Sequence, residues 1–213
     1  MEPDMQDVIE RLGTHRVVPV VAIDDAGDAE PLADALVEGG LPVAEITFRT
    51  DAAEEAIRTM ANRDDLLVGA GTVLTVEQAR MAADAGARFI VSPGVNPPVV
   101  EHCINVELPI TPGISSPTDI DLAMSFGLTA LKFFPAEAFG GIKTLKAIAA
   151  PYRMCRFIPT GGISAANLAD YLAFDKVVAC GGSWMVKGEL IAAKQFDRIA
   201  ALTREAVAIA KRG

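Results

Sequence analysis

The sequence has few cysteines and histidines, and each shortage excludes a class of site. The three cysteines lie far apart without a paired spacing, which excludes a disulfide framework and a cysteine-based zinc site. The two histidines, His15 and His102, are distant from each other and have no neighbouring ligand residues, so we expect no metal. No Gly-x-Gly-x-x-Gly run follows a predicted strand, so we expect no dinucleotide, and no other cofactor.

Basic residues are also in short supply. Lysine and arginine number 19 against 28 acidic residues, for a net charge of −9. Nucleic acids and anionic membranes bind basic surfaces, so we expect neither as a partner. No apolar run is long enough to span a membrane, and the acidic first twelve residues lack the features of a signal peptide. With the cysteines interpreted as buried free thiols, these features predict a cytoplasmic protein.

Short β-branched runs alternate with Ala-rich segments of helical spacing along nearly the whole chain. This alternation predicts an α/β fold of eight strand–helix units in one domain, residues 1–213, preceded by a short helix near residues 4–12. Eight units favour a single (β/α)8 TIM barrel over the alternative, an open doubly wound sheet. The predicted strands are 17–23, 43–48, 66–68, 89–91, 108–111, 130–134, 156–159 and 177–180, and the predicted helices are 30–38, 51–61, 76–85, 98–106, 118–126, 142–149, 165–174 and 195–211.

A lysine, Lys132, stands in the middle of the sixth predicted strand, with apolar residues on both sides. Burial is rare for lysine because the ammonium loses its hydration, so a snorkelling lysine, a salt bridge or a solvent-facing strand are structural alternatives. Desolvation favours the neutral amine, and a neutral amine attacks carbonyl carbons to form Schiff bases. The apolar flanks leave the structural and the catalytic interpretations equally open.

Three polar side chains share one face of the second predicted strand. Glu45, Thr47 and Arg49 have the same parity, so all three are able to point into a barrel together. The outer face is covered by helices and would exclude them. Arginine holds a carboxylate by paired hydrogen bonds, and glutamate serves as a general base. An internal Glu45–Arg49 salt bridge is the structural alternative.

Glycine-bearing loops follow the third, fourth, fifth, seventh and eighth predicted strands, and the first three of these loops are the segments 69–72, 92–94 and 111–113. Most such glycines mark only a tight turn. The segments 160–162 and 181–183 differ, because loops after the seventh and eighth strands of a (β/α)8 barrel often bind phosphate. Glycine lets backbone N–H groups approach an anion closely. Ser183 would add a hydroxyl and cap a short helix near residues 184–186.

The chain resembles the bacterial 2-keto-3-deoxy-6-phosphogluconate (KDPG) aldolases, which are often also active as 4-hydroxy-2-oxoglutarate aldolases. The run LKFFPAE at 131–137 and the run EITFRT at 45–50 are specific to this resemblance. Less specific segments continue it along almost the whole chain. They are VVPV at 17–20, GAGTVL at 69–74, SPG at 92–94, ITPGIS at 110–115, FIPTGGIS at 157–164 and GGSW at 181–184.

The resemblance implies a class I aldolase that reversibly cleaves 2-dehydro-3-deoxy-6-phosphogluconate to pyruvate and D-glyceraldehyde 3-phosphate. It implies no metal, a phosphorylated keto-acid as substrate, and a homotrimer. Lys132 is implied as the Schiff-base lysine, and Glu45 as the general acid and base, working partly through a bound water. The implied pyruvate-binding residues are Arg49, Thr72, Pro93 and Phe134, and the implied phosphate-binding residues are Thr160, Gly161, Gly162, Gly182 and Ser183. None of these positions departs from the family pattern.

Two other functions remain open. A phosphosugar isomerase or epimerase on the same scaffold would use Glu45 as a base and form no imine. A non-catalytic binding barrel would keep only the phosphate site. Neither alternative explains a lysine between apolar neighbours, which favours the aldolase.

Overall fold

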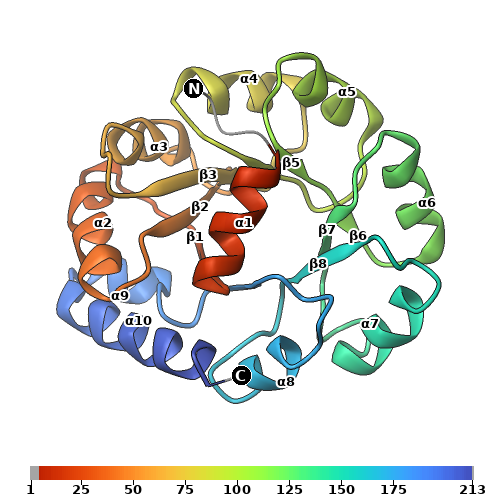
Figure 1. Ribbon diagram of the computed structural model, residues 1–213. Helices are drawn as coiled ribbons and strands as arrows, with labels where there is room; N and C mark the ends of the chain where they lie inside the picture. Colours follow the sequence, from red (N-terminus) through yellow and green to blue (C-terminus); the bar gives the residue numbers. More distant parts are fainter. Residues whose placement is uncertain (1–4, 213) are drawn as a thin grey trace.

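Parallel strands alternate with helices throughout the computed structural model, which describes residues 5–212 (Figure 1). The strands are β1 (Val17–Val21), β2 (Val43–Thr47), β3 (Leu67–Gly71), β4 (Ile90–Val91), β5 (Ile110–Thr111), β6 (Gly113–Ile114), β7 (Ala130–Phe133), β8 (Arg156–Pro159) and β9 (Cys180–Gly182). The helices are α1 (Met5–His15), α2 (Ala29–Glu38), α3 (Ala53–Ala61), α4 (Val76–Asp84), α5 (Pro97–Asn105), α6 (Pro117–Ser125), α7 (Gly141–Ala149), α8 (Leu168–Leu172), α9 (Gly188–Ala192) and α10 (Phe196–Ala210), with a 3-10 turn η1 (Ala26–Asp28) before α2.

The strands form two parallel sheets. The first has the order β5-β4-β3-β2-β1-β9, and the second has the order β6-β7-β8. Only Pro112 separates β5 from β6, and single parallel bridges join Phe157 to Val177 and Thr160 to Gly181. The helices surround the strands on their outer side (Figure 1). The predicted α/β fold with parallel strands is therefore confirmed, with its hydrogen-bonded ladder divided between two sheets.

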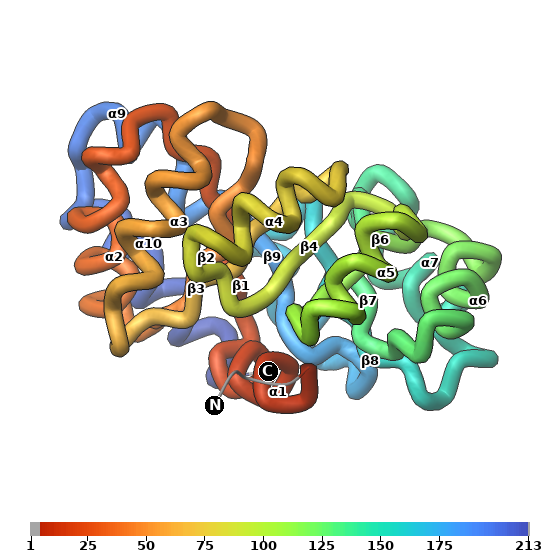
Figure 2. Tube along the Cα trace, turned by 90° about the horizontal axis from the view of Figure 1, so that it is seen from above, coloured from red at the N-terminus to blue at the C-terminus, as the bar shows by residue number. Residues whose placement is uncertain are grey.

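Both faces of the central strands are buried. Every residue of β1, β2 and β3 is buried, as expected where helices cover one side of a parallel sheet and side chains fill the other. Helix α1 lies across one end of the strands, away from α9, and adds Val8 and Leu12 to the core (Figure 2). The predicted N-terminal helix is confirmed from residue 5 onward; its start at residue 4 lies outside the described part.

The predicted ends of the third and last strands are wrong. The third strand was expected at 66–68 but continues to Gly71, and the last was expected at 177–180 but begins at Cys180. In both cases glycines that predicted a loop lie inside a strand. A Cβ at Gly69 would come within 2.3 Å of the Phe89 ring, so the missing side chain makes room for a neighbour that the local sequence does not reveal.

Two predicted helices are also wrong in extent. The helix expected at 165–174 with Ser164 as its cap is α8, five residues long with Asn167 at its N-cap position. The Asn167 side chain accepts from the Ser164 N–H and donates to the Gly162 carbonyl, which holds a turn in place of the first helical turn. The short helix expected near residues 184–186 is a turn, and α9 begins at Gly188. Within residues 5–212 no helix is long and apolar enough to cross a membrane.

Candidate active site

Lys132 of the second sheet lies close to Glu45 of the first. Lys132 lies on β7 and Glu45 on β2, and both residues are 3% exposed. The Lys132 Nζ lies 3.6 Å from the Glu45 Oε1. The structure thus excludes a solvent-facing lysine. It confirms the predicted burial and also the ion-pair alternative, with Glu45 as the partner.

The surroundings of this pair are mostly apolar. The Lys132 Nζ lies 4.9 Å from the centre of the Phe134 ring, within the range of a cation–π contact. The Glu45 Oε1 is buried and has no hydrogen-bond partner among the described residues. A buried carboxylate oxygen without a donor is costly, so it marks a position retained for something other than stability. A small cavity lies between the pair and α1. It is lined by both residues, by Thr111 and Thr160, and by Leu12 of α1.

Gly71 gives Glu45 the room to reach the lysine. It is the last residue of β3 and pairs with Thr47 of the neighbouring strand β2. A Cβ at Gly71 would lie 2.1 Å from the Glu45 Oε1 and 2.6 Å from its Cγ. Gly71 was predicted only to lie in a loop, because its role depends on a side chain from another strand.

The other two polar side chains that were predicted to share a strand face with Glu45 do not pair with it. Thr47 is fully buried, and its hydroxyl donates to the Val21 carbonyl of β1 at 2.7 Å. Arg49 lies in the turn after β2 and is exposed, and its guanidinium makes no hydrogen bond or ion pair with residues 5–212. The predicted Glu45–Arg49 salt bridge is therefore absent from this part of the chain.

Thr72 has an unusual backbone conformation. It directly follows β3, is half-buried, and has a φ of 57°. Left-handed backbone in a β-branched residue is strained by about 1–3 kcal/mol and concentrates at functional sites. The half-buried Pro93 belongs to a loop that lies close to β6, since a Cβ at Gly113 would come within 2.1 Å of the Pro93 carbonyl oxygen.

The two glycine loops predicted to bind phosphate lie side by side. The bridge between Thr160 and Gly181 joins them, and a Cβ at Gly181 would lie 2.4 Å from the Thr160 Oγ1. Gly161 and Gly162 have φ values of 100° and 79°, which favour glycine. Ser183 follows Gly182 and is exposed, and it caps no helix. The structure therefore brings these five predicted residues together at one end of β8 and β9.

Glu137 supports this pair of loops from the side. A Cβ at Gly162 would lie 2.6 Å from the Glu137 Cβ. The buried Tyr171 hydroxyl donates to the Glu137 carboxylate, and burial together with this hydrogen bond raises the pKa of Tyr171 well above its usual value. Neither Glu137 nor Tyr171 was predicted to have a role, because their contact joins residues far apart in the chain.

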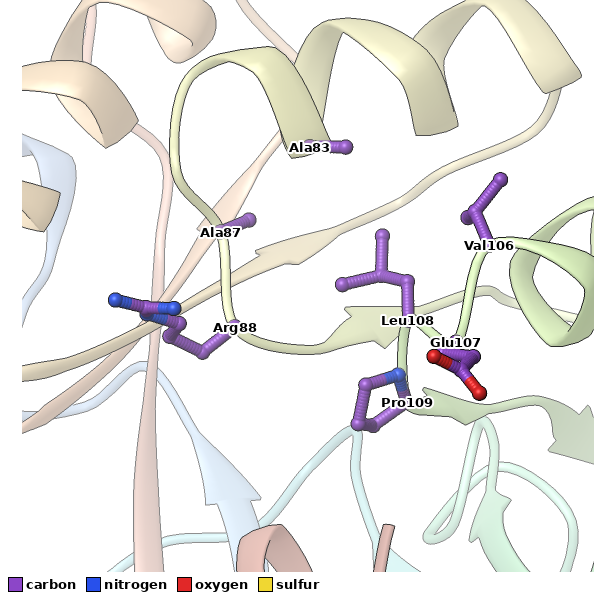
Figure 3. A pocket seen from close by; sticks show the side chains of 7 residues that line it. All are labelled: Ala83, Ala87, Arg88, Val106, Glu107, Leu108 and Pro109. Carbon is purple, nitrogen blue, oxygen red and sulfur yellow. The ribbon is translucent and has the colours of Figure 1, made fainter. Parts of the chain in front are cut away.

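An open pocket elsewhere on the surface shares no residue with this site (Figure 3). It lies beside the starts of β4 and β5, and Figure 3 shows Arg88 on one side of it and Leu108 and Pro109 on the other. Lys132, by contrast, lies on β7, and the two glycine loops lie at the ends of β8 and β9. Among the described residues, no group of three or more histidine, cysteine or acidic side chains is arranged to hold a metal.

Comparisons with known proteins agree with this geometry. The family model described as "KDPG and KHG aldolase" matches residues 8–202. The chain is 51% identical to a 2-dehydro-3-deoxy-phosphogluconate aldolase of Haemophilus influenzae, over 97% of this chain and 98% of the relative. It is 47% identical to the KHG/KDPG aldolase of Escherichia coli, over 94% of each chain.

Solved structures give the same result. A KDPG aldolase of Zymomonas mobilis with 3-phosphoglycerate has a TM-score of 0.91 and 40% identity, covering 96% of this chain and 97% of that one. A KDPG aldolase of Legionella pneumophila, with pyruvate captured as a covalent carbinolamine intermediate, has a TM-score of 0.90 and 38% identity, covering 93% and 97%. The predicted family resemblance is confirmed, and the chain belongs to the KDPG and KHG aldolase family.

Proposed function

We propose that this protein is a class I aldolase that reversibly cleaves 2-dehydro-3-deoxy-6-phosphogluconate to pyruvate and D-glyceraldehyde 3-phosphate. The observation that carries the proposal is the buried Lys132 amine, 3.6 Å from the Glu45 carboxylate. When an amine and a carboxylate lie side by side and are shielded from bulk water, the amine serves as the nucleophile and the carboxylate as the proton acceptor. The covalent pyruvate adduct of the Legionella pneumophila relative supports a Schiff-base route.

The reaction begins with the neutral amine of Lys132. It attacks the C2 ketone of the substrate, water leaves, and a protonated imine forms. Glu45 takes the proton of the C4 hydroxyl, directly or through a water. The C3–C4 bond then breaks, its electrons move into the imine, and the aldehyde departs from an enamine of pyruvate. Glu45 returns a proton to C3 of the enamine, and hydrolysis releases pyruvate and the amine.

The remaining residues are proposed to hold the substrate. Arg49, whose guanidinium has no partner in residues 5–212, and the strained Thr72 follow the ends of β2 and β3, where they would bind the pyruvate carboxylate. Pro93 and Phe134 would form walls, and the Phe134 ring already lies against the lysine amine. Holding the reacting groups in one orientation contributes up to about 7–11 kcal/mol in well-oriented reactions.

The phosphate is proposed to bind at Thr160, Gly161, Gly162, Gly182 and Ser183. Their backbone N–H groups lie in two adjacent loops, and the small side chains allow close approach. A phosphorylated keto-acid fits such a site, and the Zymomonas mobilis structure holds 3-phosphoglycerate. The E. coli relative is named for both substrates, so 4-hydroxy-2-oxoglutarate is a second candidate for this chain, cleaved to pyruvate and glyoxylate.

We also propose that residues 1–213 form a single domain, a closed (β/α)8 barrel. The short gap at Pro112 and the single bridges from Phe157 and Thr160 support a continuous ring of eight strands. The family resemblance supports a homotrimer. The three cysteines are unpaired and buried, which supports a reducing compartment such as the cytoplasm.

Borohydride trapping tests the central proposal. The protein is incubated with pyruvate and borohydride, and the modified peptide is located by mass spectrometry. We expect a reduced pyruvate adduct on Lys132, no adduct in Lys132→Met, and full activity with a chelator present. An adduct on another lysine would contradict the assignment. Sugar-phosphate isomerisation or epimerisation without trapping would favour the isomerase or epimerase alternative, and unchanged ligand binding without any turnover would favour the binding barrel.

A further inference from the structure

Tyr171 and Glu137 form a contact beside the phosphate loops that has no assigned part in the reaction. Tyr171 lies on α8 and is 1% exposed, and its hydroxyl donates to the Glu137 carboxylate. Burial and this hydrogen bond raise the pKa of Tyr171, so the hydroxyl stays a donor at neutral pH. Glu137 lies in the turn that follows β7. The contact therefore ties α8 to the strand that carries the reactive lysine.

The Glu137 side chain packs against the loop of Gly161 and Gly162. A Cβ at Gly162 would lie 2.6 Å from both the Cβ and the Cγ of Glu137. The backbone contributes as well, because the Glu137 N–H donates to the Gly161 carbonyl at 3.0 Å and the Ala136 N–H donates to the Thr160 carbonyl at 2.8 Å. At such close packing, a movement of the Glu137 side chain requires a movement of the loop.

Helix α8 holds the same loop at a second point. The Asn167 side chain, at the N-cap position of α8, donates to the Gly162 carbonyl at 3.1 Å. Tyr171 lies one helical turn further along and acts on Gly162 through the Glu137 side chain. Gly162 is thus held at its carbonyl by Asn167 and at its Cα by Glu137.

The N–H groups of this loop are left for an anion. Those of Gly161 and Gly162 donate to no group within residues 5–212, and Gly161 is half-buried while Gly162 is exposed. Successive backbone N–H groups in turns with left-handed residues form concave sites for anions. The positions of these two N–H groups therefore depend on the contacts that hold Gly162.

We propose that Tyr171 and Glu137 are positioning residues, which hold the N–H groups of Gly161 and Gly162 in place for the phosphate of the substrate. Without the Tyr171 hydroxyl, the Glu137 side chain is no longer fixed against Gly162, and the loop must be ordered when the phosphate binds. The pair then sets the affinity for the phosphorylated aldehyde and not that for pyruvate. The inference rests on the proposed function, because it assigns a support to the phosphate site of that reaction.

Condensation of pyruvate with D-glyceraldehyde 3-phosphate tests the two ends of the site separately. Tyr171→Phe removes the hydroxyl and keeps the ring. It is expected to raise KM for the aldehyde phosphate about tenfold, the effect of losing a hydrogen bond to a carboxylate, while KM for pyruvate and kcat change less than about twofold. A rise in KM for the aldehyde phosphate alone is the result that a purely structural role would not produce.

Variants of Glu137 test the same contact from the other side. Glu137→Ala is expected to raise KM for the aldehyde phosphate at least as much as Tyr171→Phe does. Glu137→Gln keeps the stem and an acceptor for the hydroxyl, so it is expected to recover most of this loss. Because Tyr171 and Glu137 act through one contact, the double variant of Tyr171→Phe and Glu137→Ala is expected to be no worse than Glu137→Ala alone.

Tyr152→Phe is the matched control. The Tyr152 hydroxyl also donates to a carboxylate, at 2.9 Å, but that carboxylate belongs to Asp121 of α6. This variant loses the same kind of hydrogen bond and is expected to keep both wild-type KM values. A rise in KM for the aldehyde phosphate in Tyr152→Phe equal to that in Tyr171→Phe would overturn the proposal, because the effect would then not depend on the phosphate loop.

Three other results would also overturn the proposal. One is Tyr171→Phe with the wild-type KM for the aldehyde phosphate. Another is an equal rise in both KM values, or a loss of kcat alone, because the whole site or the chemical step would then be affected. The last is a Glu137→Gln variant as impaired as Glu137→Ala, because the charge of Glu137 and not its contact with Tyr171 would then matter.

Two measurements distinguish this proposal from the proposed function itself. If the wild type forms the Lys132 adduct with pyruvate and Tyr171→Phe keeps every wild-type constant, the aldolase assignment stands and the positioning role fails. If the wild type forms no adduct, the aldolase assignment fails, and calorimetric titration with inorganic phosphate still tests the loop. Tyr171→Phe is expected to bind inorganic phosphate about tenfold more weakly than the wild type, and equal affinities would overturn the positioning role.

Discussion

Replacing Gly71 by alanine is expected to disable the site while leaving every proposed catalytic residue in place. The added methyl group would lie 2.1 Å from the Glu45 Oε1 and 2.6 Å from the Glu45 Cγ. Carbon and oxygen atoms pack best at about 3.5 Å, so the carboxylate must move by about 1 Å or more. The glycine is the end of a fully buried strand, so neither β3 nor its neighbours are able to yield freely.

A displacement of this size has a large catalytic cost. Misplacing a catalytic group by about 1 Å lowers the rate by about 100-fold, so Gly71→Ala is expected to lose about two orders of magnitude in kcat. The overpacked strand is expected to lower the free energy of unfolding by about 1–3 kcal/mol. Steady-state kinetics with 2-dehydro-3-deoxy-6-phosphogluconate and urea unfolding of the same preparation measure the two effects separately.

Gly188→Ala is the control for the added methyl group. A Cβ at Gly188, the first residue of α9, would find its nearest neighbour, the Ala22 carbonyl oxygen, at 3.9 Å. This variant is expected to keep wild-type kcat and stability. A Gly71→Ala protein that is folded and retains kcat within threefold of the wild type would refute the reasoning, because it would show that the position of Glu45 does not limit catalysis.

Three further predictions concern the phosphate loops, the strained residue and a buried thiol. Gly162→Ala is expected to raise KM for the phosphorylated substrate at least tenfold and to change KM for 4-hydroxy-2-oxoglutarate little. The added methyl group would collide with Glu137, and a φ of 79° is strained for alanine, so only the phosphate loop would move. Equal losses on both substrates would contradict this. Thr72→Gly relieves about 1–3 kcal/mol of backbone strain and costs about 0.5–1 kcal/mol, because glycine gives the unfolded chain more conformational entropy. Thermal unfolding should therefore show equal or higher stability, while KM for pyruvate rises. A clear loss of stability would show that Thr72 is not strained. Burial raises the pKa of Cys103 from 9.0 to about 11, so the unfolded thiol ionises first and stability is lost as the pH rises from 9 to 11. Urea unfolding at pH 8 and pH 11 should show that Cys103→Ala removes about 2 kcal/mol of this loss, and an unchanged loss would show that the thiol ionises equally in the folded state.

Much of the fold could be predicted from local patterns. The strand at Arg156–Pro159 was predicted with its observed bounds, and most other strands and helices were predicted within one or two residues. Burial on both faces makes each strand a short apolar run, and these runs stand out against the Ala-rich helices. The errors among the strands fall at the glycines of β3 and β9, where the local sequence indicated a turn and a side chain from elsewhere made glycine necessary inside a strand.

The sequence by itself indicated a buried amine and a base, from a lysine in an apolar strand and a glutamate of inward parity, and its family resemblance indicated the aldolase chemistry. Only the tertiary structure decided how these groups meet. It paired Glu45 with Lys132 instead of Arg49 and used Gly71 to make room for the carboxylate. These contacts join strands far apart in the chain, and their distances depend on how the strands curve around a common interior, which no local pattern encodes.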